Sequence, residues 1–180
     1  MSSRLELSAK HIDLAGDGVG EVDGLRVKAR GLFGGEGALV EIVHRSRHRA
    51  TAVGRVVEVL RPHPSRREAP CTEHDSRGGR CGGCALMALG EAAQREQKRD
   101  MLRAIGLEVD SVKGGPSLGY RCSSKRVVFA DGGGLRLGSW ARGSHEGATM
   151  AGCLVDHPSI AAAADEVERE ARALGIEPYD

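Results

Sequence analysis

Three of the five cysteines lie within fourteen residues, in the stretch Cys71-Thr-Glu-His-Asp-Ser-Arg-Gly-Gly-Arg-Cys81-Gly-Gly-Cys84. The two glycines of the last four residues let the backbone turn so that both sulfurs face one point. Cys153, further along the chain, could supply a fourth thiolate. Four thiolates around one point suit zinc or an iron–sulfur cluster, and the spacing alone does not choose between them.

Other uses of these cysteines are less consistent with the sequence. The N-terminus has no apolar signal core, so we expect a cytoplasmic protein, in which clustered thiols bind metal or do redox work more often than they form disulfides. A redox Cys-x-x-Cys normally opens a helix in a βαβ unit, and no such pattern precedes Cys81. His74 could be a zinc ligand, but as a single loop histidine we expect it to be solvated. Cys122 is left over, and we expect a packed or half-exposed thiol.

Composition limits the fold and suggests a partner. Only 3% of the 180 residues are aromatic, so the core must consist of Val, Leu, Ile and Ala. The longest apolar run is far shorter than the roughly 18 residues that a membrane span needs. Residues 1–67 hold twelve Lys and Arg against eight Asp and Glu. This excess of positive charge in the N-terminal part favours an anionic partner, and nucleic acid is the first candidate. An ordinary solvated surface would also account for it.

Residues 1–62 are predicted to form a small OB-like β-barrel. Short alternating stretches are separated by glycine-rich turns, and Asp23-Gly24 is a two-residue hairpin signal between two of them. Gly54 interrupts a β-branched run and predicts a bulge or bend. Basic side chains alternate in two places, so each set would share one face of a strand and could grip a phosphate backbone. These residues are Arg26, Lys28 and Arg30 in the hairpin, and Arg45, Arg47 and Arg49 further on.

The rest of the chain reads as a linker with the cysteine loop, residues 63–88, and an incomplete α+β domain, residues 89–180. Two prolines in Arg61-Pro62-His63-Pro64 predict an extended linker. We expect a helix over about residues 86–105 and strands over residues 120–129 and 135–140. Pro158 is a good first helical residue, and apolar residues at 4-3-4-3 spacing, from Ile160 to Leu174, predict an amphipathic helix. Arg121 and Lys125 add positive charge and are further candidates for RNA contact.

The order of these features resembles the N-terminal part of the RNA (uracil-5-)-methyltransferase family. The resemblance rests on the basic barrel, the Pro62 to Cys71 linker, Cys81-Gly-Gly-Cys84, a helix with Gln94 and Lys98, Leu118-Gly-Tyr-Arg121, and a late cysteine before a proline. It covers essentially the whole chain. The Cys-Gly-Gly-Cys and the Gly-Tyr-Arg are its most specific parts.

The resemblance implies a fold and a function. The barrel would be a TRAM domain that binds RNA, and Cys71, Cys81, Cys84 and Cys153 would hold a four-iron four-sulfur (4Fe-4S) cluster. The family transfers a methyl group from S-adenosylmethionine to C5 of a uracil. Members with both barrel and cluster mostly modify ribosomal RNA, so ribosomal RNA is favoured over transfer RNA as the partner.

Two features depart from the family pattern. Nine residues separate Cys71 from Cys81, more than the family usually has, and we expect the extra residues to sit in a surface loop. The S-adenosylmethionine site and the catalytic cysteine of the family have no counterpart here. We therefore expect the chain to be inactive alone, with a catalytic half on another chain as one possible completion. A non-enzymatic RNA-binding zinc module is the alternative function.

Overall fold

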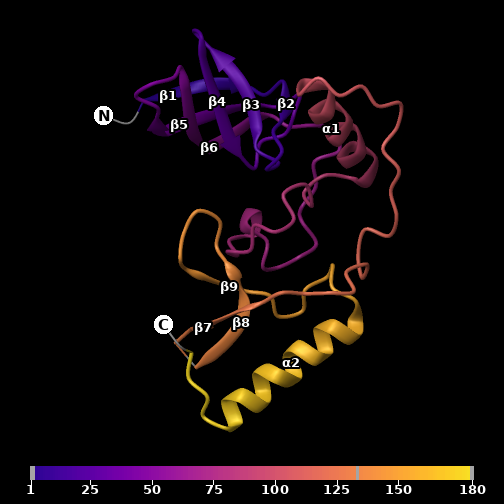
Figure 1. Ribbon diagram of the computed structural model, residues 1–180. Coiled ribbons are helices and arrows are strands. Elements are labelled where there is room, and N and C mark those ends of the chain that lie inside the picture. Colours follow the sequence, from indigo (N-terminus) through magenta and orange to yellow (C-terminus); the bar gives the residue numbers. More distant parts are fainter. Residues whose placement is uncertain (1–2, 133, 179–180) are drawn as a thin grey trace. The chain divides into compact units, whose positions relative to one another are not determined.

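The computed structural model describes residues 3–132 and 134–178 (Figure 1). Contacts divide the chain into two compact units, and each is a combination of separated segments. Unit 1 holds residues 1–68 and 85–113, and unit 2 holds residues 69–84 and 114–180. No helix in the described ranges has the length and apolar character that crossing a membrane requires.

Unit 1 is built on a six-stranded mixed sheet in the order β1-β5-β6-β4-β3-β2. Only the β4–β6 pair is parallel, and the other pairs are antiparallel. The strands are β1 (Arg4–Ser8), β2 (His11–Ile12), β3 (Gly18–Val22), β4 (Leu25–Arg30), β5 (Gly37–Arg45) and β6 (Thr51–Arg61).

The sheet curves because one continuous segment borders both of its edges. β1 pairs with β5, while the N–H of Lys10, two residues after β1, donates to the carbonyl of Val19 in β3. The concave side encloses an aliphatic core, as the low aromatic content predicts. Its fully buried members include Leu7, Val27 and Val40. The predicted OB-like β-barrel is thus observed as a curved mixed sheet, and residues 85–113 with helix α1 belong to the same unit.

Local sequence signals explain two features of this sheet. Asp23 and Gly24 both have positive φ, 50° and 74°, which is the type I′ geometry that a two-residue hairpin prefers, and they connect β3 to β4. Gly54 lies opposite an irregular stretch of β5, where the register shifts. A Cβ at Gly54 would lie 2.1 Å from Cγ1 of Val40, so the glycine allows β5 and β6 to pack closely.

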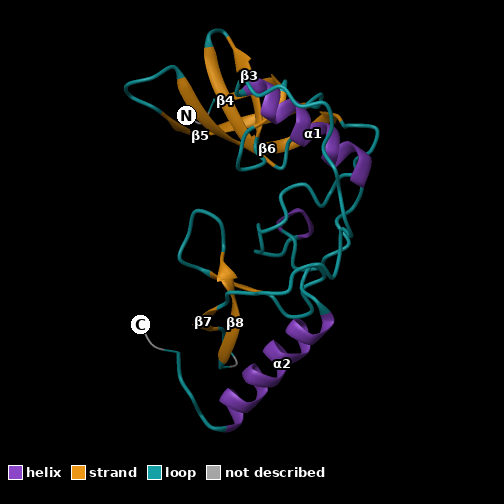
Figure 2. Cartoon of the chain, turned by 45° about the vertical axis from the view of Figure 1, so that its right-hand side comes forward, coloured by secondary structure: helices purple, strands orange, loops and turns teal. Residues whose placement is uncertain are grey.

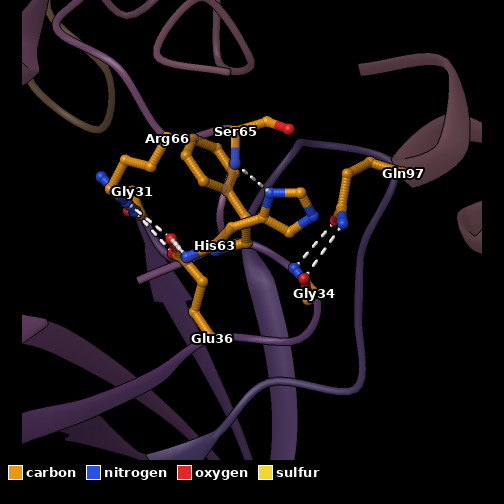
Figure 3. Close-up of polar contacts among 8 residues, drawn as sticks. Gly31, Gly34, Glu36, His63, Ser65, Arg66 and Gln97 are labelled. Carbon is orange, nitrogen blue, oxygen red and sulfur yellow. Dashed lines mark hydrogen bonds and ion pairs between the residues drawn. The ribbon is translucent and has the colours of Figure 1, made fainter. Parts of the chain in front are cut away.

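The linker after β6 is not extended throughout as predicted, because it turns at Pro64 and Ser65, where the Arg66 N–H donates to the His63 carbonyl. The carboxylate of Glu36 is buried and accepts hydrogen bonds from the N–H groups of Phe33 and His63 (Figure 3). The Arg66 guanidinium lies 2.6 Å from both Glu36 oxygens and stands over the Phe33 ring. A buried carboxylate needs partners of this kind, and the chain supplies them by folding the linker back.

Helix α1 (Glu91–Ala104) begins five residues later than predicted. The preceding residues are not helical because their backbone pairs with the linker: Arg67 N–H donates to the Ala88 carbonyl, and Gly90 N–H donates to the Ser65 carbonyl. Within unit 1, Gln97 fixes the helix to the β4–β5 loop through two hydrogen bonds with the backbone of Gly34, of 2.8 and 3.0 Å (Figure 3).

Unit 2 contains a three-stranded antiparallel sheet in the order β7-β8-β9 and one long helix (Figure 2). The elements are β7 (Val127–Ala130), β8 (Leu135–Trp140), β9 (Gly147–Thr149) and α2 (Pro158–Ala173). The predicted strand over residues 120–129 is confirmed only for its last part. Arg121 instead makes an isolated parallel bridge with Asp156, because its N–H donates to the Val155 carbonyl and its own carbonyl accepts from His157.

Helix α2 begins at Pro158 as predicted, but its apolar stripe is not buried. Val167 and Leu174 are 57% and 74% exposed. The helix contacts β8 through charged side chains: Glu168 accepts the N–H of Leu137 at 2.9 Å, and Arg172 Nε donates to the Leu135 carbonyl at 2.7 Å. These side chains satisfy backbone groups of β8 that β9 is too short to reach.

Candidate functional site

The cysteine loop in unit 2 is closed by its own backbone. Cys81 N–H donates to the Glu73 carbonyl, and Asp75 N–H donates to the Cys81 carbonyl. The residues between them form the short 3-10 helix η1 (Asp75–Arg77), which ends at Gly78 with φ of 84°. The nine residues between the first two cysteines therefore form a folded turn rather than a loose insertion.

Unit 2 brings together the four cysteines that the sequence singled out. Burial raises the pKa of Cys84 to about 11, and the nearby Cys81, Cys153 and Cys71 thiols add to this rise. Burial also raises the pKa of Cys71, and Cys81 and Cys153 again contribute. The four thiols thus influence one another electrostatically, although Cys153 is remote in sequence. Cys122 is exposed and is not among them.

The four sulfurs do not converge as they would around a single metal ion. Within the described ranges, no three His, Cys, Asp or Glu side chains are placed to hold one ion. A tetrahedral zinc site, with Zn–S bonds of about 2.3 Å, brings its sulfurs to about 3.8 Å from one another. The donor set thus fits metal chemistry by its residue types, while the described side chains do not form a closed site for a single ion.

His74 is buried, with only 4% of its surface exposed, so the expectation of a solvated loop histidine is wrong. Its Nδ1 accepts the N–H of Ser76 at 3.1 Å, which caps helix η1. Its Nε2 lies 3.1 Å from the carbonyl oxygen of Cys84. Because a carbonyl can only accept, Nε2 must carry a proton and donate it. Both nitrogens are engaged, so His74 holds Cys84 in place and is not oriented as a metal ligand.

A buried acidic residue, Asp156, is hydrogen-bonded through its backbone N–H to the Cys153 carbonyl. Asp156, three residues after Cys153, accepts from Arg126 at 2.8 Å and from the Ser124 hydroxyl at 3.1 Å. Arg121 lies 3.8 Å from the other Asp156 oxygen. The Arg121 charge lowers the pKa of Cys84 and so opposes the larger effect of burial. Arg121, predicted as an RNA contact, thus lies beside the cysteines and is half-buried, while Lys125 is exposed.

The remaining predicted RNA-binding residues lie in unit 1, in two sets. On β4, Arg26 and Lys28 point outward and Arg30 is half-buried, as the alternation predicts. Carboxylates partly balance this row, since Lys28 lies 3.9 Å from Asp13 and Arg26 is directly opposite Glu21.

The second set does not share a strand face as predicted. Strand β5 ends at Arg45, and Arg47 and Arg49 lie in the turn before β6. The reason is Ser46, whose hydroxyl accepts the N–H groups of His48 and Arg49 and folds the chain into a turn. All three arginines are exposed. No Asp or Glu occurs between Glu41 and Glu58, so this turn is the most strongly basic part of unit 1.

Several known proteins are similar to this chain in sequence, although no family model matches it. An uncharacterized RNA methyltransferase of Parasynechococcus marenigrum is 32% identical over 184 residues, which cover 96% of this chain and 38% of that protein. The 23S rRNA (uracil(1939)-C(5))-methyltransferase RlmD of Halomonas elongata is 34% identical over 172 residues, covering 89% of this chain and 34% of that protein.

A solved structure supports the fold. The tRNA (uracil-54, C5)-methyltransferase of Pyrococcus abyssi, solved in complex with S-adenosyl-L-homocysteine, matches with a TM-score of 0.59 over 95% of this chain at 19% identity. The match covers 37% of that structure. The chain therefore spans well under half the length of the proteins it matches, and it is homologous to part of proteins named RNA methyltransferases.

Proposed function

We propose that this chain is the RNA-binding and iron–sulfur-binding part of an S-adenosylmethionine-dependent RNA (uracil-5-)-methyltransferase that acts on ribosomal RNA in the cytoplasm. The observation that carries the proposal is the 34% identity with a 23S rRNA (uracil-C5)-methyltransferase over 89% of this chain. The curved sheet of unit 1 would be a TRAM domain. Methyl transfer is assigned to no residue of this chain.

The basic turn of unit 1, Arg45 to Arg49, supports RNA binding. Its three exposed arginines and one exposed histidine, His48, lie in a stretch without carboxylates, so phosphates could approach it without competing ion pairs. Unit 1 offers one aromatic ring, Phe33, and that ring is buried under Arg66. We therefore expect unit 1 to contact the RNA backbone and to contribute little base recognition.

The cysteine set supports the iron–sulfur part of the proposal. Cys71, Cys81, Cys84 and Cys153 would each bind one iron of a four-iron four-sulfur cluster. Each thiolate of such a cluster has its own iron, so the sulfurs stand further apart than around one zinc ion. The four thiols influence one another's pKa, which supports a shared site, and metal analysis is needed to choose between a cluster and one zinc ion. We assign the cluster a structural role, joining the cysteine loop to the segment around Cys153.

Metal analysis tests this part directly. Iron, acid-labile sulfide and zinc would be measured per chain, on protein purified without oxygen. About four irons and four sulfides per chain are expected. About one zinc without sulfide would instead establish the alternative, an RNA-binding zinc module. A Cys81→Ser variant should lose the metal, and a Cys122→Ser variant is the matched control that should retain it.

Salt dependence tests the RNA part. Anisotropy of a fluorescein-labelled single-stranded RNA would be followed between low and moderate salt. A triple variant with Gln at positions Arg45, Arg47 and Arg49 should reduce the slope of log K against log salt by about 0.7 to 0.9 for each phosphate contact that those arginines make. A second triple variant, with Gln at Arg95, Lys98 and Arg103 of α1, removes equal charge and should leave the slope nearly unchanged. A flat slope for the unmodified protein would refute phosphate binding.

A further inference from the structure

The only tryptophan of the chain lies on the surface of unit 2. Trp140 is the last residue of β8 and is 47% exposed. Tryptophan can bury roughly 150–250 Å² of surface, so leaving half of it in water forgoes much stabilisation. In a chain with so few aromatic residues, this exposure calls for a reason other than packing.

The indole is held in place by two other rings. The Phe129 ring on β7, itself 8% exposed, lies 6.4 Å from the Trp140 ring at 45°. The His145 ring lies 6.4 Å away on the turn that follows, at 64°. Gly147 is directly opposite Trp140 on β9 and presents no side chain to it. A Cβ at Gly147 would lie 2.0 Å from the Phe129 ring, so this position must stay open.

The turn from Trp140 to Gly147 is also ordered. Ala141 N–H donates to the Glu146 carbonyl at 2.8 Å, and Ser144 N–H donates to the Ala141 carbonyl at 3.0 Å. The Ser144 hydroxyl accepts the N–H of Glu146 at 3.1 Å. The rings are therefore presented by a fixed turn, and little conformational freedom would be given up when a ligand stacks on them.

Charged groups around the turn favour an anionic ligand. Arg142 is exposed on the turn, and Arg80 of the cysteine loop is 63% exposed. Glu146 is the only Asp or Glu between residues 132 and 155, and it lies 3.9 Å from Arg80. Apart from the Phe129 ring, the side chains around the turn are mostly polar or charged, unlike the apolar centre of a protein–protein interface.

We propose that Trp140 is a stacking platform for an unpaired base of the RNA, with Arg142 and Arg80 near the flanking phosphates. The inference rests on the proposed RNA-binding function and adds a base contact in unit 2 to the phosphate contacts of unit 1. Stacking on an aromatic face tolerates any base, so this contact selects single-stranded over duplex RNA rather than a particular sequence.

Because the chain has a single tryptophan, its fluorescence reports directly on binding at Trp140. A single-stranded oligouridine would be titrated into the protein while the tryptophan fluorescence is recorded, with anisotropy of the labelled oligonucleotide measured in parallel. We expect quenching with the same midpoint as the anisotropy change. Trp140→Leu should weaken binding by about 5- to 150-fold, the range for removal of one stacked base, and Trp140→Phe should weaken it less. The salt slope of Trp140→Leu should equal that of the unmodified protein, because no phosphate contact is removed.

The controls separate this inference from the function on which it rests. Val167→Ala shortens a similarly exposed apolar side chain of the same unit and should not change the affinity. If RNA binds without changing the fluorescence, or if Trp140→Leu binds as tightly as the unmodified protein, the platform is refuted and the proposed function stands. If anisotropy shows no RNA binding at low salt, both are refuted.

Discussion

Replacement of Glu36 by Gln should strongly destabilise unit 1. The Glu36 side chain is fully buried and its two oxygens accept four hydrogen bonds, two from Arg66 and one each from the N–H groups of Phe33 and His63. Gln offers one oxygen and an NH2 group, so two of these donors would face another donor. Breaking one partner of a buried ion pair costs about 3–5 kcal/mol. We expect about 3 kcal/mol here, because Arg66 is partly exposed and can recover some hydration.

This destabilisation is measurable as a shift of the urea midpoint, followed by far-UV circular dichroism. Hydrogen exchange of peptides from β4 and β5 would show that the change lies in unit 1, since two units need not unfold together. Glu41→Gln is the matched control: Glu41 pairs with Arg55, which is 71% exposed, and such pairs contribute about 1 kcal/mol or less. A Glu36→Gln variant no less stable than Glu41→Gln would refute the reasoning.

The same contacts predict how stability depends on pH. Burial alone would raise the pKa of Glu36, but the hydrogen bonds from Arg66, His63 and Phe33 outweigh it and lower the pKa below the ordinary value. A carboxyl with a lowered pKa in the folded state contributes stability above its unfolded pKa, and this contribution is lost as the pH falls through the folded pKa. Unit 1 should therefore lose stability below about pH 4.5, and Glu36→Gln should lose less in that range.

Three further predictions concern packing, thiol reactivity and the edge of β8. Gly54→Ala should lower the stability of unit 1 by about 1–3 kcal/mol in urea titrations, because its Cβ would overlap Val40. In the metal-free protein, mass spectrometry after brief iodoacetamide treatment at pH 8 should find Cys122 modified first, because it is exposed, and Cys84 last, because burial raises its pKa to about 11. Glu168→Gln should destabilise unit 2 by about 1–3 kcal/mol, measured by tryptophan fluorescence in urea, because Arg136 and the Leu137 N–H use different Glu168 oxygens and one of these two donors would face the new NH2 group.

Short sequence motifs correctly predict turns and helix starts whose backbone conformation depends on the motif residues themselves. Asp23-Gly24 requires positive φ at two consecutive residues, which few residue pairs tolerate, and the hairpin follows from that alone. Pro158 likewise marks the start of α2. The predicted helix start at Leu86 failed because the backbone near Ala88 pairs with the linker, a partner more than twenty residues away in sequence. A helical pattern cannot reveal such a competing partner.

Helix α2 shows a second limit of pattern reasoning. Its apolar spacing predicts that Val167 and Leu174 are buried, yet the helix contacts β8 through Glu168 and Arg172. The backbone of β8 extends beyond the end of β9, and its open N–H and C=O groups need partners more than the helix needs to bury aliphatic surface. Which groups remain open depends on strand lengths, and the sequence did not predict β9 at all.

The sequence predicts four candidate ligands for the proposed metal site, and it does not predict the residues that support them. Clustering of cysteines in the sequence identifies Cys71, Cys81 and Cys84 as candidate ligands from spacing alone. Cys153 was assigned to the same site through the family resemblance. His74 carries no comparable signal, since one histidine in a polar loop looks like any other. Its role arises because the nine residues after Cys71 fold into a capped turn that buries the imidazole and directs Nε2 at the Cys84 carbonyl. The longer spacing that departs from the family pattern thus supplies a support for Cys84, in place of a loose insertion.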